Sequence, residues 1–235
     1  MARSFFTTRV SYRSAGWSAI TSGILGLLAF AALITAVLTR TSWEITPRIW
    51  FLFNVHNAVT ILQFLSMIPL AIGLYNLSHK QSPGMSRATL NIGIVTLSLT
   101  ALFNLLYFPK IMSDEYYMIP QGVFGVWLIA VNWQLKSILS KGLRWFGIIV
   151  GFGLALVGVY EIGFAIFVDP SGLRIPAPDF ESIKDPGDTT ANIIVHLILD
   201  IGTFIGVLPF PIWAITIGRK LLREKEEQLL TKNLT

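Results

Sequence analysis

Long apolar runs separated by short polar segments dominate the sequence. Each run is about 20 residues or longer, and a helix of about 20 residues crosses the roughly 30 Å hydrocarbon core of a bilayer. The pattern therefore predicts an all-α, polytopic membrane protein with six transmembrane helices in one bundle. The predicted spans are residues 16–38, 50–77, 87–108, 119–138, 143–168 and 190–218.

The segments between and after the spans suggest how the chain is organised. Residues 1–218 are predicted to form one transmembrane domain, and residues 219–235 a basic, amphipathic tail. The connection over residues 169–190 is rich in proline, glycine and acidic residues, which argues against a further span. The first run is too long for the apolar core of a typical signal peptide, so we expect it to be a retained helix.

Proline and glycine inside the spans predict local geometry. Pro209 and Pro211 should bend the sixth helix. Two G-x-x-x-G pairs should allow close helix packing within the chain, because glycine lets two backbones approach. These pairs are Gly147 with Gly151 and Gly202 with Gly206.

Composition supports the membrane interpretation. The chain is 53% hydrophobic and 13% charged, against about 25% charged in a typical soluble domain. The mean hydropathy is +0.64. There is no cysteine, which excludes disulfides, iron–sulfur clusters and thiolate zinc sites. No basic soluble face is visible, so we expect no nucleic-acid partner.

The basic residues predict the orientation in the membrane. Of the 18 Lys and Arg residues, only Arg40, Arg48, Lys110, Arg174 and Lys184 lie in the connections that follow the first, third and fifth spans. The remaining 13 lie in the termini and the alternate connections, and the side of a membrane rich in Lys and Arg is the cytoplasm. Both termini are therefore predicted to be cytoplasmic. Tyr116 and Tyr117, near a predicted helix end, are expected to be interfacial anchors.

Four ionisable residues lie inside the predicted spans. Such residues are costly in a bilayer and usually face the interior of a bundle. At 1.5 Å per residue, His56, Glu161 and His196 lie about 9 to 10 Å from the same outer boundary, and Asp200 lies one turn deeper. Groups from three helices thus share a similar depth. We predict a polar pocket in the outer leaflet formed by His56, Glu161, His196 and Asp200.

Neighbouring positions extend the predicted pocket. His56, Thr60 and Gln63 share one helix face, and His196 and Asp200 share another. Gly158 and Ala165 lie on the face of Glu161, where we expect them to leave room around its carboxylate. The residues expected to support the pocket are Asn57, Gln63, Asn104, Gln121 and Tyr160.

Several activities fit such a pocket. Imidazole and carboxylate ligate divalent metals, so His56, His196, Glu161 and Asp200 could hold a metal ion in a membrane hydrolase. Two histidines at matched depth could instead ligate haem or a pigment.

Two further hypotheses involve no cofactor. Chains of Asp, Glu and His inside a bundle often relay protons or bind a transported ligand. Alternatively, the polar groups satisfy one another, and the protein is a non-catalytic accessory or assembly subunit. Our preferred hypothesis is a pocket that binds or relays a proton, a metal ion or a small ligand. The expected partners are the bilayer and either a second copy of the chain or a membrane complex.

Two stretches of the C-terminal half carry a resemblance. "KGLRWFGIIVGFGLALVGV" is a basic loop leading into a glycine-rich helix, and "LPFPIWAITIGRKLL" closes the last span. Together with the length and the six-helix layout, they resemble uncharacterised bacterial multi-pass membrane proteins of the domain-of-unknown-function kind. The resemblance implies a bacterial inner membrane and assigns no role to any residue.

Overall fold

The computed structural model describes residues 12–39, 46–81, 85–109, 111–112, 114–169 and 189–233. These residues form helices and turns, with no strand among them, which confirms the all-α prediction. The elements in chain order are α1 (Tyr12–Thr39), α2 (Pro47–Gln81), α3 (Arg87–Tyr107), η1 (Asp114–Tyr117), α4 (Met118–Gln134), α5 (Lys141–Phe167), α6 (Thr190–Gly202), the π-helical turn η4 (Thr203–Val207) and α7 (Phe210–Asn233).

Every predicted span coincides with helix, although the spans differ in length. Within the described residues, five helices are long and apolar enough to cross a bilayer, counting α6 to α7 as one. α4 is the exception, because its 17 residues end at Gln134. The prediction carried this span to residue 138, but the chain turns from Leu135 onwards. The predicted tail is helical as far as Asn233 and continues α7.

Two helices begin at side-chain caps. The Ser86 hydroxyl accepts a hydrogen bond from the Thr89 backbone N–H before α3. Thr189 accepts one in the same way from Asn192 before α6. Each cap satisfies an N–H group that would otherwise have no partner in the first turn. Most of the predicted outer connection before Thr189 lies outside the described residues.

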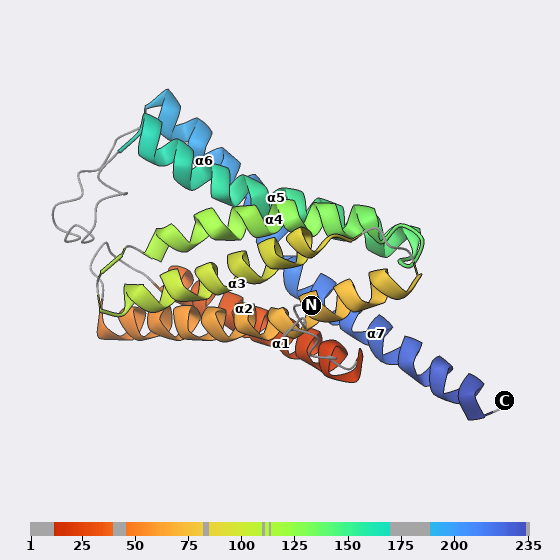
Figure 1. The fold of residues 1–235 in the computed structure, drawn as a ribbon. Helices are drawn as coiled ribbons and strands as arrows, with labels where there is room; N and C mark the ends of the chain where they lie inside the picture. The colour runs from red at the N-terminus through yellow and green to blue at the C-terminus, as the bar shows by residue number, and fades with distance from the viewer. Residues whose placement is uncertain are drawn as a thin grey trace, which may run out of the picture.

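Helices that follow one another in the chain pack side by side. α1 packs against α2, α2 against α3, α3 against α4, and α4 against α5. The last span closes the bundle by crossing it: α6 and η4 pack on α5, whereas α7 packs mainly on α1 (Figure 1). As a result α6 lies beside α5 and apart from α2 and α3.

The crossing depends on a break in the last span, close to the predicted prolines. At η4 the Leu208 backbone N–H donates to the Thr203 carbonyl oxygen over 2.9 Å, a spacing of five residues rather than four. Pro209 follows directly and has no N–H to donate. The chain re-enters a regular helix at Phe210.

Glycines allow the closest helix approaches. A Cβ atom on Gly153 of α5 would lie 2.5 Å from the Cα of Gly206 in η4. One on Gly122 of α4 would lie 2.6 Å from the Cα of Gly158 in α5. The predicted G-x-x-x-G glycines also face neighbours of the same chain: Gly147 meets Asn132, Gly151 meets Gly125, and Gly202 and Gly206 meet Gly153. Their predicted use in intramolecular packing is confirmed.

The middle of the bundle is apolar and aromatic. Phe64 of α2, Phe124 of α4 and Phe210 of α7 have ring centroids 5.7 to 6.1 Å apart. Trp127 stacks on Phe124 and Trp213 on Phe210. We call these five buried side chains the aromatic cluster.

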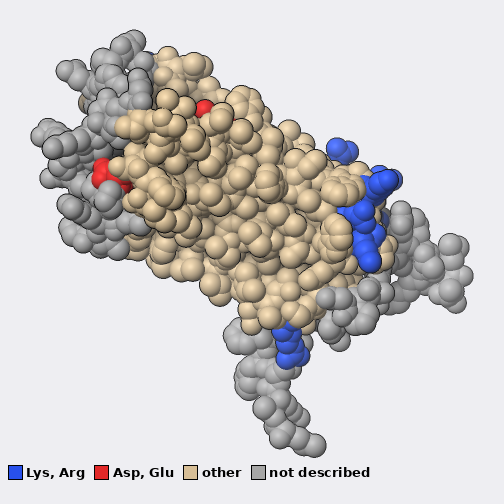
Figure 2. Space-filling model, turned by 90° about the horizontal axis from the view of Figure 1, so that it is seen from above, with Lys and Arg blue, Asp and Glu red and all other residues tan. Residues whose placement is uncertain are grey.

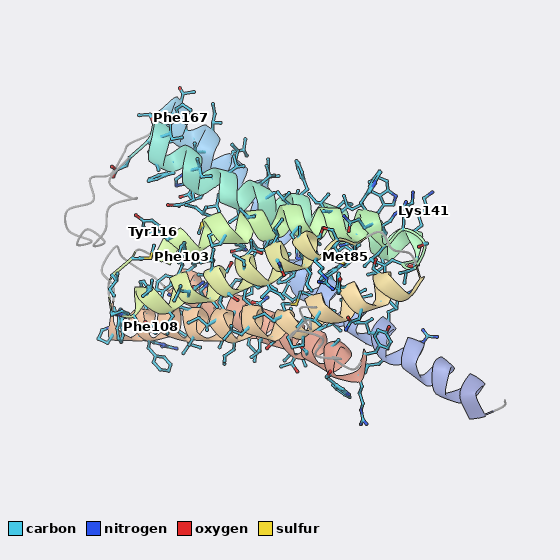
Figure 3. The ribbon with its side chains drawn as sticks, viewed as in Figure 1. Met85, Phe103, Phe108, Tyr116, Lys141 and Phe167 are labelled. Atoms are coloured by element: carbon cyan, nitrogen blue, oxygen red, sulfur yellow. The ribbon has the colours of Figure 1, made fainter. Side chains whose placement is uncertain are left out.

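Charge separates the two ends of the molecule. Lys and Arg gather at one end of the face in Figure 2, and Asp and Glu appear toward the other. We call the end that carries Lys141 and Lys220 the basic end; the Lys220 ammonium donates to the Ile138 carbonyl oxygen over 2.9 Å. Figure 3 places Phe108, Tyr116 and Phe167 at the opposite end, which we call the far end.

Candidate functional site

A small cavity with several polar side chains in its mostly apolar wall lies between α1, α2, α4 and α7. Its volume is about 40 Å³, and a water molecule needs at least about 10 to 15 Å³ by the same kind of measure, so the cavity has room for a few waters. The polar side chains that line it are His56, Thr60, Gln63, Tyr117 and Gln121.

The second-helix stripe predicted from the sequence forms one wall of this cavity. His56, Thr60 and Gln63 all line it, and Phe64 and Phe210 of the aromatic cluster bound it as well. Because α2 runs from His56 to Phe64 toward the basic end, the aromatic cluster closes the cavity on that side. The cavity therefore belongs to the half of the bundle nearer the far end.

His56 is held against α1 by its ring. Its Nδ1 lies 2.9 Å from the Ala29 carbonyl oxygen. A carbonyl oxygen only accepts, so Nδ1 carries the hydrogen, which leaves Nε2 as an acceptor in the neutral ring. Nearby, the Ser22 hydroxyl donates to the backbone carbonyl oxygen of Gln63 over 3.0 Å. The Ser18 hydroxyl donates to the backbone carbonyl oxygen of Ser66. The cavity wall is thus fixed by bonds between α1 and α2.

Buried amides in this half have atoms without a protein partner. The carbonyl Oε1 of Gln121, the Nδ2 of Asn57 and the Oδ1 of Asn104 have no hydrogen bond within the described structure. The other amide end of Asn104 donates to the Thr100 carbonyl oxygen over 2.9 Å. An unsatisfied buried polar atom costs about 1 to 3 kcal/mol. Water in the cavity can satisfy Gln121, which lines it.

Glu161 lies near η1 and outside the lining of the cavity. It is only 1% exposed on α5. It lies close enough to Tyr116 that, after the larger effect of burial, its negative charge also raises the pKa of the Tyr116 phenol. That phenol therefore stays protonated at neutral pH and can donate a hydrogen bond. Tyr116 therefore lies near Glu161, and the next residue, Tyr117, lines the cavity.

The predicted room around Glu161 is occupied by protein. We expected Gly158 to leave space for the carboxylate. Instead the backbone of α4 fills that space, because a Cβ on Gly158 would lie 2.7 Å from the Cα of Gly122. The small residue lets α4 approach α5, and this approach buries Glu161.

His196 and Asp200 face out of the bundle. Both are exposed on α6. The His196 ring packs edge-on against Tyr160 with centroids 5.7 Å apart, and lies 6.1 Å from the ring of Phe164. Tyr160, predicted to support the pocket, is buried and supports His196 instead.

The four ionisable residues therefore do not converge as predicted. His56 lines a cavity whose walls do not include Glu161, His196 or Asp200. α2 makes no extensive contact with α5 or α6. In the described part of the chain, no three His, Asp or Glu side chains come close enough to hold a metal ion. The expected metal site is not formed among the described residues, and the two histidines lie on helices that make no extensive contact with each other.

Two tyrosines near the start of α4 do not occupy the positions that the sequence predicts. Tyr116 and Tyr117 were expected to be interfacial anchors. Tyr116 is buried, and Tyr117 lines the cavity. The spacing carried a usable signal, because Tyr117 and Gln121 are four residues apart and share a face where η1 continues into α4.

Comparison with known proteins adds no relative. No family model, no curated protein and no solved structure matches this chain. The resemblance to uncharacterised bacterial membrane proteins stays a prediction, and the function must be argued from the site.

Proposed function

We propose that this protein spans the bacterial inner membrane six times, with both termini in the cytoplasm, and that the far half of its bundle binds and relays protons. The relay runs between His56 and Glu161 through Tyr116, Tyr117, Gln121 and the water of the cavity. The observation that carries the proposal is that two adjacent tyrosines at the η1–α4 junction link the two groups: Tyr117 lines the cavity together with His56, and Tyr116 lies near the buried Glu161.

The length of α4 is compatible with a sixth span. Its 17 residues cover about 26 Å at 1.5 Å per residue, and η1 adds one turn at the far end. The hydrocarbon core is roughly 30 Å thick. The clustering of Lys and Arg at the basic end supports a cytoplasmic location for that end (Figure 2).

The size and chemistry of the cavity favour a proton over a larger ligand. Sites for drug-sized molecules usually enclose about 300 to 1,000 Å³, whereas this cavity has about 40 Å³. Its lining offers an imidazole, a hydroxyl, a phenol and two amides, all of which bind water or pass protons. A buried carboxylate beside a protonated phenol provides a second proton site.

Proton flux into liposomes tests the relay. Purified protein is reconstituted with a trapped pH-sensitive dye, and a potassium diffusion potential drives protons across the membrane. We expect wild type to conduct protons above empty liposomes, and Glu161→Gln and His56→Gln to lose most of that flux. Asp169→Asn, at the end of α5 outside the cavity, is the matched control. Wild-type flux equal to that of empty liposomes, or full flux in both variants, would contradict the relay.

A second candidate is a non-catalytic subunit of a membrane complex. The exposed His196 and Asp200 favour it, because ionisable side chains directed out of a membrane bundle call for a partner. If neither His56 nor Glu161 affects proton flux, this candidate takes precedence.

A further inference from the structure

The outward face of α6 combines two ionisable side chains with large exposed apolar ones. His196 and Asp200 are four residues apart, and both are exposed. Leu197 is 56% exposed and Phe204 is 74% exposed on the same side. From Thr190, where α6 begins, Asp200 lies about 15 Å along the helix. If α6 starts at the bilayer boundary, Asp200 lies near the middle of the hydrocarbon core.

The described part of the chain gives these two side chains no polar partner. No described residue forms a hydrogen bond or ion pair with the side chain of Asp200 or His196, and the two side chains do not bond to each other. The imidazole packs against the aromatic rings of Tyr160 and Phe164. A carboxyl group in hydrocarbon without such a partner is unfavourable, and acyl chains offer none.

Among the described elements, only α5 and η4 make extensive contact with α6. α6 packs on α5, and at η4 the last span turns away toward α1. The neighbouring part of α5 is also apolar and exposed, at Ile162, Ile166 and Phe167. Figure 1 shows α6 beside α5 at one edge of the bundle, and Figure 3 places Phe167 at the tip of that edge.

We propose that this α6 face binds the α6 face of a second copy of the chain, with His196 of each copy hydrogen-bonded to Asp200 of the other. The face is self-complementary, because it carries one donor and one acceptor one turn apart. A two-fold axis along the membrane normal places the two α6 helices parallel, so each His196 reaches diagonally to the Asp200 of the other copy, about 6 Å further along the helix, and the symmetry forms both pairs. The exposed apolar side chains then pack around the pairs, and the proton relay plays no part in this association.

Charge complementarity favours a second copy over other occupants. A lipid headgroup cannot satisfy a carboxyl group at this depth without leaving the interface. A different protein would need its own acceptor and donor one helical turn apart at this depth, whereas a second copy carries that pair by symmetry. Hydrogen bonds between membrane helices stabilise association by roughly tenfold or somewhat more in affinity.

Energy transfer between labelled copies in liposomes tests the pairing, at a series of protein-to-lipid ratios. We expect His196→Ala and Asp200→Ala each to weaken association by about tenfold. Mixing a His196→Ala copy with an Asp200→Ala copy should restore part of the signal, because one His–Asp pair can form between them. The swapped double variant His196→Asp with Asp200→His should recover more. Thermal melting of each single variant checks that its monomer is folded.

Cysteine cross-linking locates the interface, since the chain has no cysteine of its own. We expect Leu197→Cys to form a disulfide-linked dimer under mild oxidation. Leu28→Cys, equally exposed at 55% but on α1, is the control and should stay monomeric. The proposal is overturned if wild type stays monomeric at every ratio, if both cysteines cross-link equally, or if the mixed variants associate no better than each alone. Wild type that stays monomeric but retains another protein or lipid would assign the face to that partner.

Discussion

The stripes on α2 and α6 look alike in sequence and lie in opposite environments. Each has a histidine near the far end of its helix and a polar residue four positions on: Thr60 after His56, and Asp200 after His196. The α2 stripe lines an internal cavity, whereas the α6 stripe is exposed. In a membrane helix a shared polar face therefore does not reveal whether that face meets the interior of its own bundle or another molecule.

The largest difference in stability is expected between a substitution in the aromatic cluster and one on the exposed α6 face. Phe210, 2% exposed, closes the cavity on the side of the basic end, and Phe204, 74% exposed, lies on the α6 face. Phe210→Ala should lower the free energy of unfolding by about 3 to 5 kcal/mol, because it leaves a void among packed rings. Phe204→Ala should have little effect on the monomer. Thermal unfolding in detergent at low protein concentration measures both, and equal losses would contradict the assignment of inside and outside.

The backbone contact between α5 and η4 should give the next largest change in stability when it is disturbed. Gly153→Ala places a methyl group 2.5 Å from the Cα of Gly206, where only backbone can move. We expect it to destabilise the protein by about 1 to 3 kcal/mol, as overpacking usually does. Gly142→Ala adds the same methyl group where no atom lies within 4 Å, and it should be neutral. Comparable melting temperatures for the two variants would argue against this contact.

The hydrogen bonds behind the cavity wall should contribute least. Ser22→Ala removes the buried bond to the Gln63 carbonyl oxygen, and we expect a loss of about 1 kcal/mol. Thr216→Ala removes an exposed hydrogen bond within one helix. We expect it to change the free energy of unfolding by only a few tenths of a kcal/mol. Chemical unfolding in mixed micelles can resolve the difference. A larger loss for Thr216→Ala would mean that the wall is not held by α1.

The helices and the cavity stripe could be predicted from the sequence, because apolar run length and helical period are local properties. The early end of α4 could not, since no proline or glycine marks the turn that begins at Leu135. The surroundings of Glu161 also depended on tertiary contacts: whether Gly158 leaves a space or admits another backbone is decided by Gly122, 36 positions earlier in the sequence. The outward direction of His196 and Asp200 depended on where η4 turns the last span.

The most direct test concerns the proposal that His56 and Glu161 exchange protons with each other through the η1–α4 junction. Infrared difference spectra of the reconstituted protein, recorded between acidic and alkaline buffer in H₂O and D₂O, follow the carboxyl groups. We predict a carboxyl signal that shifts in D₂O, disappears in Glu161→Gln, changes in His56→Gln and is unaffected by Asp200→Asn. A Glu161 signal that responds neither to pH nor to D₂O, or that is identical in His56→Gln, would contradict the claim.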